Sequence, residues 1–104
     1  MSDSTLTGNE LFSAVVLTAK PGQAAALAEI GRRFAAACRR SEPGLKSIRI
    51  HQSVDNPADF LVYETFADAA AFKAHFETAH FKGIVEPEIV PIVSRRERTT
   101  YRSL

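Results

Sequence analysis

The sequence lacks several features that would assign the protein to a compartment or a membrane. It has 104 residues, no tryptophan and one cysteine, Cys38. A single cysteine excludes an intrachain disulfide, and nothing in the sequence indicates an oxidising compartment. No apolar run approaches the roughly eighteen residues that a membrane span needs. Residues 1–10 are polar, without the basic and apolar regions of a signal peptide, and predict a flexible tail. We therefore expect a cytoplasmic protein that does not enter membranes.

An excess of charge of one sign is also missing. Thirteen Lys and Arg stand against twelve Asp and Glu, so the formal net charge is +1. This balance argues against a nucleic-acid or acidic-membrane binder. The local exception is an arginine cluster at Arg95, Arg96, Arg98 and Arg102. On a strand the last three would share one face, which more often means a solvated sheet edge than an anion clamp.

Cofactor and metal motifs are not found either. No glycine-rich phosphate loop follows any predicted strand, so neither flavin nor nicotinamide is expected. His75 and His80 are five positions apart, about 140° on an ideal helix, and would not share a face. A metal site is therefore not expected. Thr78 offers another arrangement, because it can end one helix and cap a new turn that aims His80 independently of His75.

The patterns that are present predict alternating strands and helices. Residues 11–19 form a short apolar strand, and Leu27, Ile30, Phe34 and Cys38 mark the buried side of a helix between Gln23 and Glu42. Two more strands are predicted at 45–54 and 60–66, then a helix over 69–77 with Asp68 as N-cap, and a last strand from 89 to 102.

This order predicts a single α+β domain over residues 11–104 with a ferredoxin-like βαββαβ fold. Two helices cover one face of a four-stranded antiparallel sheet in that fold. The first and third predicted strands are apolar on both faces, whereas the helices cover only one. The other face needs a partner, most simply a second copy of the chain in a homodimer.

Several short motifs, in their order and spacing, resemble the antibiotic biosynthesis monooxygenase (ABM) family. They are Pro21-Gly22, Glu42-Pro43-Gly44, Leu61-Val62-Tyr63-Glu64 with Phe66, Ala74-His75-Phe76 and Ala79-His80-Phe81. The resemblance covers residues 11–102 and implies a dimeric α/β barrel. It also implies a cofactor-independent monooxygenase of the quinol monooxygenase type, which oxidises a quinol, phenol or other enolisable aromatic with dioxygen.

The same family includes an isomerase of a small phosphorylated hydroxyketone, of the autoinducer-processing type, and haem-degrading enzymes. The haem-degrading members rely on a tryptophan and an asparagine, but this chain has no tryptophan and Val15 stands near the position expected for the asparagine. No haem is therefore expected. The arginine-rich end resembles the isomerase-like members, so the isomerase stays an alternative. A dimeric binding domain without catalysis is a further alternative.

The resemblance implies that His75 or His80 meets the substrate. A neutral imidazole is suited to accept a proton from a phenol or enol, which could then react with dioxygen without a cofactor. A flat ring would be held by Tyr63, Phe66, Phe72, Phe76 and Phe81, although these side chains would equally suit a core.

Glu64 stands in an apolar strand, where an unpaired carboxylate is costly to bury. It either pairs with Arg49 or a histidine, or its face opens into a cavity. We take Glu64 as a catalytic candidate that orients the imidazole, with a purely structural ion pair as the alternative. Arg49 is a substrate-binding candidate.

Overall fold

The computed structural model describes residues 6–104, so the first half of the predicted tail lies outside the described residues. The predicted strands and helices are present, with a further helical segment before the last strand. In chain order the elements are β1 (Leu11–Ala19), α1 (Ala24–Ser41), β2 (Leu45–Gln52), β3 (Asp59–Phe66), α2 (Ala69–His75), η2 (Phe81–Ile89), η3 (Val90–Ile92) and β4 (Val93–Arg102).

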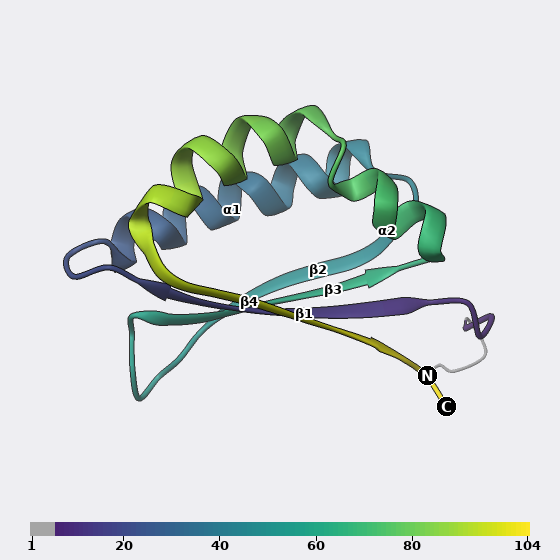
Figure 1. Cartoon of the computed structure of the whole chain (residues 1–104), viewed down its shortest axis with the longest axis horizontal. Helices are drawn as coiled ribbons and strands as arrows, with labels where there is room; N and C mark the ends of the chain where they lie inside the picture. The colour runs from purple at the N-terminus through teal and green to yellow at the C-terminus, as the bar shows by residue number, and fades with distance from the viewer. Residues whose placement is uncertain (1–5) are drawn as a thin grey trace.

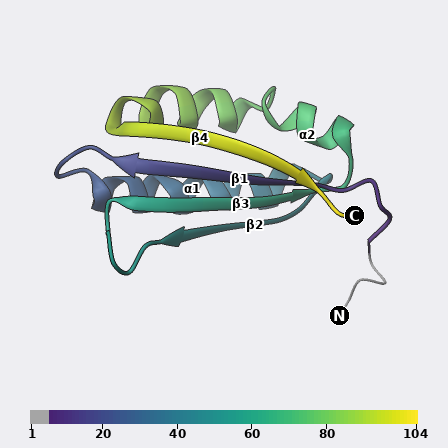
Figure 2. The same ribbon diagram turned by 60° about the horizontal axis from the view of Figure 1, so that its bottom comes forward.

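The strands form one antiparallel sheet in the order β2-β3-β1-β4. Figure 1 shows α1, α2 and the helical segment after α2 on the same side of this sheet, so no helix or strand of residues 6–104 covers the opposite face. Figure 2, turned to show the sheet from below, shows β4 and β2 as its two edges. The predicted ferredoxin-like α+β fold is therefore confirmed.

The main correction concerns the segment before β4, which was predicted to be strand from residue 89. Ile89 ends the π-helical segment η2, and Val90–Ile92 form a 3₁₀ turn. Val85 and Ile89 are buried four positions apart, which is a helical spacing, and both pack into the core. Pro91 lies in the first turn of η3, where the missing N–H is tolerated. The apolar residues of this segment therefore form the buried side of a helix.

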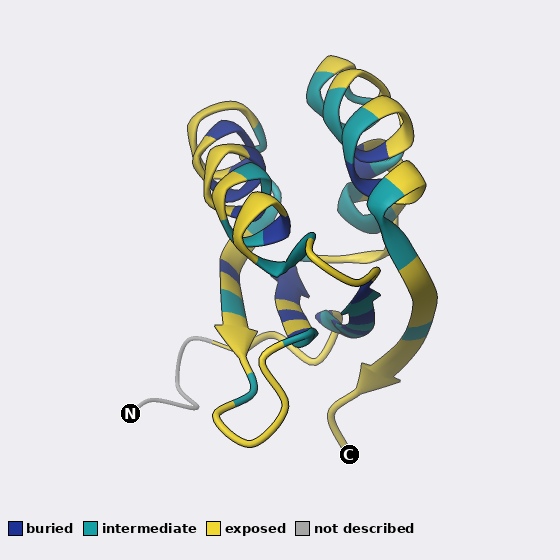
Figure 3. Ribbon diagram, turned by 90° about the vertical axis from the view of Figure 1, so that its left-hand side faces the viewer, coloured by how far each residue is buried: buried dark blue, intermediate teal, exposed yellow. Residues whose placement is uncertain are grey.

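The core lies between the helices and the inner face of the sheet, as the buried segments in Figure 3 show. Along β1, the inward residues Val15, Leu17 and Ala19 are buried while their neighbours are only half-buried. In α1 the buried positions include Leu27 and Phe34, as the helical spacing predicts. Among the described residues, no helix is long and apolar enough to span a bilayer.

The residues just before β1 are held against the sheet by Glu10. The Glu10 side chain is buried and accepts hydrogen bonds from the backbone N–H groups of Thr7 (2.9 Å) and Gly8 (3.0 Å). Its carboxylate also pairs with Lys46 of β2 at 3.1 Å. The predicted flexible tail over 1–10 is thus anchored at its last residue.

Gly44 allows the turn after α1 to lie against α2. A Cβ atom at this position would stand 2.4 Å from the Ala71 Cβ atom, closer than packed side chains approach. We expect Gly44→Ala to lower the free energy of unfolding by about 1–3 kcal/mol, measured by urea denaturation. Gly83→Ala is the control, because a Cβ there meets nothing within 4 Å. Equal effects of the two substitutions would contradict the packing argument.

Candidate active site

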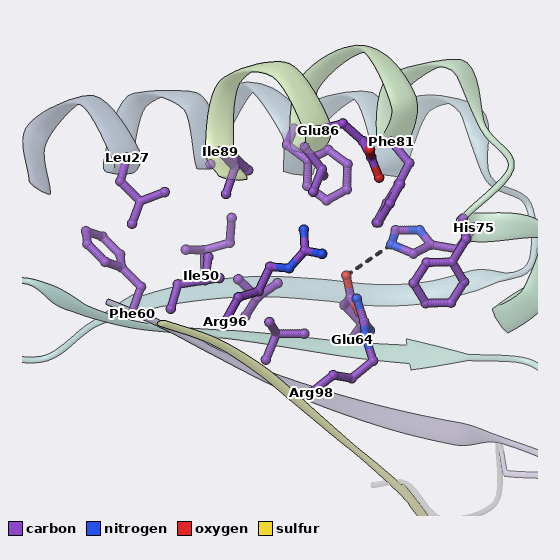
Figure 4. Close-up of a pocket in the computed structure, with 17 residues that line it drawn as sticks. Leu27, Ile50, Phe60, Glu64, His75, Phe81, Glu86, Ile89, Arg96 and Arg98 are labelled. Carbon is purple, nitrogen blue, oxygen red and sulfur yellow. Dashed lines mark hydrogen bonds and ion pairs between the residues drawn. The ribbon is translucent and has the colours of Figure 1, made fainter. Parts of the chain in front are cut away.

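A cavity of about 540 Å³ lies between the helices and the inner face of the sheet. Figure 4 shows an apolar end near Leu27, Ile50 and Phe60, and an ionisable end at His75 and Glu64. Its wall is mostly apolar, which suits a hydrophobic ligand. The lining residues are Val15, Leu17, Leu27, Gly31, Phe34, Ile50, Phe60, Val62, Glu64, His75, Phe76, Phe81, Val85, Glu86, Ile89, Arg96 and Arg98.

The predicted break near Thr78 is present and places both histidines. The helix α2 ends at His75, two residues earlier than predicted. Thr78 Oγ1 donates to the His75 carbonyl at 2.8 Å and accepts from the Phe81 N–H at 3.2 Å. The chain therefore turns between His75 and His80, and both side chains reach the same carboxylate.

That carboxylate belongs to Glu42, which was predicted only to end α1. His75 Nδ1 lies 2.9 and 3.0 Å from the two Glu42 carboxylate oxygens, and His80 Nε2 lies 2.5 Å from Oε2. Glu42 is the C-cap residue of α1, where the helix dipole disfavours negative charge. The printed contacts of Glu42 are with His75 and His80, which are distant in the sequence. The sequence signal for such partners was a carboxylate at the C-terminal end of a helix, where another part of the chain must compensate its charge.

The other ring nitrogen of His75 faces the cavity. The side chain is fully buried, and Nε2 makes no hydrogen bond within the described part of the chain. Its nearest carboxylate oxygen is Glu64 Oε2 at 3.4 Å, shown by the dashed line in Figure 4. This distance is long for a hydrogen bond. Glu42 thus fixes the ring through Nδ1 and leaves Nε2 for a group inside the cavity.

Glu64 was predicted to pair with Arg49 or a histidine or to face a cavity; it lines the cavity and forms ion pairs with His75 and Arg98, not with Arg49. Its Oε1 accepts from Arg98 at 3.0 Å, and Arg98 also donates to the Ser13 hydroxyl. The Arg98 guanidinium lies over the Phe76 ring, 4.8 Å from its centre. Arg98 therefore neutralises a buried carboxylate and packs against an aromatic wall.

The two acidic neighbours change the protonation of His75. Burial by itself lowers the pKa of His75, but the Glu64 and Glu42 carboxylates outweigh burial and raise that pKa above 6.5. Burial raises the pKa of Glu64, but His75 and Arg98 outweigh it and hold the pKa below 4.5. A protonated His75 and Arg98 together balance the charges of Glu42 and Glu64.

These shifts predict how stability depends on pH. The raised pKa of His75 adds stability below about pH 6.5, and that stability is lost as pH rises through the folded-state value. The lowered pKa of Glu64 adds stability above about pH 4.5, lost as pH falls through the folded-state value. The two contributions are therefore largest together between about pH 4.5 and 6.5.

Urea denaturation at a series of pH values, for the wild type and for His75→Gln, would measure the His75 contribution. The difference in unfolding free energy between the two proteins should shrink as the pH rises above 7. A difference that grows towards alkaline pH would contradict the raised pKa.

Only part of the predicted aromatic site lines the cavity. Phe76 and Phe81 are in its wall. Phe66 and Phe72 are not, although the Phe66 ring packs 5.2 Å from the His75 ring, and Phe72 packs 5.3 Å from Phe66. These two side chains pack behind the cavity wall without lining it.

Tyr63 and Arg49 lie on the other face of the sheet, paired in register between β3 and β2. Both are exposed, and neither lines the cavity. A ligand in this cavity would not reach them, because the strand period of two alternates them with Glu64 and Ile50, which point inward.

Sequence reasoning did not predict Glu86, and it grouped Arg96 and Arg98 on one strand face as either a solvated edge or an anion clamp. Both arginines lie on the inner face of the edge strand β4 and line the cavity, with Arg96 exposed and Arg98 half-buried. Glu86 lines the cavity from η2. Arg96 and Glu86 are exposed, which places the cavity mouth between β4 and η2. The even spacing of Arg96 and Arg98 was the available signal, but sequence alone did not show which face was inward.

Three side chains around Glu42 are chemically able to hold a metal ion. The ligand atoms of Cys38, Glu42 and His80 lie within 4.8 Å of one another. Burial, followed by the Glu42 carboxylate, raises the pKa of the Cys38 thiol, which favours the protonated form over the thiolate that a metal binds. The hydrogen bonds of His75 and His80 to Glu42 also account for the cluster without an ion.

The sequence and the fold were compared with those of known proteins. The profile of the family described as Antibiotic biosynthesis monooxygenase (ABM) matches residues 11–87. No curated protein matches the chain.

Solved structures are similar over nearly the whole chain. A candidate antibiotic biosynthesis monooxygenase from Nitrosomonas europaea is 27% identical, with a TM-score of 0.86 over 95% of this chain and 94% of that one. A protein from Pseudomonas aeruginosa is 26% identical, with a TM-score of 0.82 over 92% and 95%. A protein from Shewanella oneidensis shares the fold at 21% identity, with a TM-score of 0.86 and 95% of each chain covered. The chain belongs to the antibiotic biosynthesis monooxygenase family.

Proposed function

We propose that this protein is a cofactor-independent monooxygenase that oxidises a phenol or quinol with dioxygen, and that His75 is its catalytic base. One observation carries the proposal: His75 Nε2 is buried, faces the cavity and makes no hydrogen bond among the described residues, while Glu42 holds Nδ1. The family membership and the description of the Nitrosomonas protein support the same class of reaction.

The first step is proton transfer from the substrate hydroxyl to Nε2. The raised pKa of His75 makes its neutral form a stronger proton acceptor than an ordinary histidine, and the step needs a pH at which His75 has lost its own proton. The imidazolium that forms lies between Glu42 and Glu64, which stabilise its charge. The Glu42–His75 pair thus has the roles of the carboxylate and imidazole in a catalytic triad, with the substrate in place of serine.

The remaining chemistry belongs to the substrate and dioxygen. The phenolate donates electrons to dioxygen, and a new C–O bond forms at a ring carbon that bears a hydrogen, ortho or para to the hydroxyl in a phenol and ortho to it in a quinol. Loss of the C–H proton from that carbon breaks the O–O bond. One oxygen atom stays in the quinone product and the other leaves as water. The apolar wall limits the access of water to the reactive anion.

His80 and Glu64 have separate roles in this proposal. His80 contacts Glu42 and does not line the cavity, so it orients the carboxylate that holds His75. Glu64 lines the cavity next to Nε2 and stabilises the imidazolium. Phe76 and Phe81 lie against the His75 ring, with centres 5.3 Å away in both cases, and would pack against a flat substrate.

Oxygen-electrode measurements with naphthohydroquinones and phenols would test the proposal. Uptake should exceed the rate of the free substrate in air, survive a chelator, and fall in His75→Gln. The proposal would be contradicted if, with every substrate, the wild type consumed oxygen no faster than His75→Gln.

The isomerase is the second candidate, because Arg96 in the cavity wall could hold a phosphate. Proton exchange at the carbon next to a carbonyl, followed by NMR without oxygen, would identify it. The mostly apolar lining favours an aromatic substrate over a small phosphorylated sugar derivative.

We also propose that a second copy of the chain covers the outer face of the sheet and forms a homodimer. The non-catalytic binding domain, the other alternative, would form the same dimer. Leu61, Tyr63 and Tyr101 are exposed at 37%, 40% and 54% on that face. The strand register places them against Val16, Ala14 and Phe12 of β1, so the apolar surface is continuous. Sedimentation velocity should give a dimer for the wild type and a monomer for Tyr63→Asp. A wild-type monomer would contradict this interface.

A further inference from the structure

We propose that Arg96 is an anion-binding residue at the cavity mouth, so that the ligand is an aromatic carrying an acidic group as well as its reactive hydroxyl. This proposal rests on the proposed function for the hydroxyl end of the ligand. The proposal that the other end of the ligand is acidic is independent of that function and rests on the charges of the cavity wall.

The first step is the charge balance of the wall. Glu64 and Arg98 form an ion pair at 3.0 Å, and His75 lies between Glu64 and Glu42. These groups compensate one another. Arg96 also lines the cavity, but it makes no ion pair or hydrogen bond with any residue that the structure describes.

Among the arginines of β4, Arg96 combines a place in the cavity wall with the lack of a described partner, whereas Arg98 is paired with Glu64 and neither Arg95 nor Arg102 lines the cavity. Arg95 alternates with Arg96 along the strand and pairs with Glu97 at 2.9 Å. Figure 4 shows the Arg96 side chain rising from β4 into the cavity, between the apolar end and the His75 end. A guanidinium in this place can form two parallel hydrogen bonds to a carboxylate.

The strand geometry sets the spacing of the two ends of the ligand. Arg96 pairs in register with Leu17 and Arg98 with Val15, so Arg96 lies two residues from the ionic pair of Arg98 and Glu64. Two residues of strand span about 6.5–7 Å. A ligand with its hydroxyl at His75 Nε2 would reach Arg96 with an acidic group on the far side of one or two aromatic rings.

Glu86 is the acidic group on the opposite side of the mouth. It lines the cavity from η2 and is exposed, and no contact joins it to Arg96. Its charge repels an anionic ligand, so the net preference of the mouth depends on both residues. Removing the Glu86 charge should therefore strengthen the binding of an acid, whereas removing the Arg96 charge should weaken it.

Binding of a matched pair of ligands tests the proposal without any turnover. The probes are 6-hydroxy-2-naphthoate and the neutral 6-hydroxy-2-naphthamide, which have almost the same shape, measured by isothermal titration calorimetry under nitrogen. The wild type should bind the carboxylate about ten-fold more tightly than the amide. Arg96→Gln should remove the preference, Arg96→Lys should keep part of it, and Glu86→Gln should increase it.

The matched control is Arg95→Gln, which removes a positive charge from the neighbouring position on the other face and should leave the preference unchanged. Thermal melting of each variant checks that it is folded. The preference should also decrease at high salt, because both mouth residues are exposed.

A wild type that binds neither probe, or both equally, would overturn the proposal. So would a preference that persists in Arg96→Gln, or one that Arg95→Gln removes to the same degree. If the preference is found but acid-bearing quinols give no oxygen uptake, the proposed oxygenase reaction fails and the acid site stands. If neutral quinols alone are oxidised, the oxygenase stands and the acid site fails.

Discussion

Replacing His75 with glutamine should reduce kcat/KM for oxygen-dependent turnover by about 10²–10⁴-fold, the range that a positioned general base contributes. Glutamine keeps a polar group near Glu42 and Glu64 but cannot accept the substrate proton at neutral pH. The substitution therefore tests proton transfer with less damage to the buried contacts than His75→Ala. The measurement is the initial rate of oxygen uptake with the best substrate of the panel.

His51→Gln is the matched control, because His51 is an exposed histidine on β2. Its rate should equal that of the wild type. Glu42→Gln should retain folding and reduce the rate less than His75→Gln, because it acts through the orientation and basicity of the imidazole. A His75→Gln rate within about three-fold of the wild type would mean that His75 is not the base, since a base contributes far more.

Replacing Arg98 with methionine should lower the free energy of unfolding by about 3–5 kcal/mol, because it removes one of the two cations, Arg98 and protonated His75, that balance the buried Glu64 and Glu42 carboxylates. The Glu64 side chain is 1% exposed and that of Arg98 is 26% exposed, so solvent screens this pair weakly. Methionine keeps much of the packing against Phe76. The measurement is urea denaturation at pH 6, where both pKa shifts contribute to stability.

Two further variants separate charge from packing. Glu64→Gln combined with Arg98→Met should recover much of the loss, because the uncompensated carboxylate is gone. Arg33→Met should cost much less than Arg98→Met, because Arg33 pairs with Glu88 on the surface, where the side chains are 51% and 36% exposed. Similar losses from Arg98→Met and Arg33→Met would contradict the buried-pair argument.

Much of the fold follows from local patterns in the sequence. The apolar run of β1, the spacing of Leu27 and Phe34 in α1, and the Asp68 cap of α2 are each set by a few neighbouring residues. Asp68 accepts from the Ala71 N–H at 2.8 Å, as an N-cap residue does. The turn at Thr78 was also predictable, because its hydroxyl bonds only to residues three positions away.

The site was harder to predict because it depends on contacts between distant parts of the chain. Glu42 and His75 are 33 positions apart, and Glu64 and Arg98 are 34 apart. Sequence reasoning identified His75, His80 and Glu64, and it offered either Arg49 on the adjacent strand or a histidine as the partner of Glu64. The histidine is present as His75, whereas the Arg49 pairing fails because Arg49 is opposite Tyr63, on the outer face. The face of each strand that points inward is decided by packing against the helices.

The most direct test of the account is the ionisation of a phenol bound in the cavity. A nitrophenol is added to the protein under nitrogen, and the absorption band of its phenolate is followed as the pH is lowered. The account predicts that bound phenol gives its proton to His75, so the wild type should hold the phenolate at pH values where the free probe is neutral. The His75→Gln variant should not. A bound probe that titrates in the wild type as it does in water, or equally in both proteins, would contradict the role of His75 as the base.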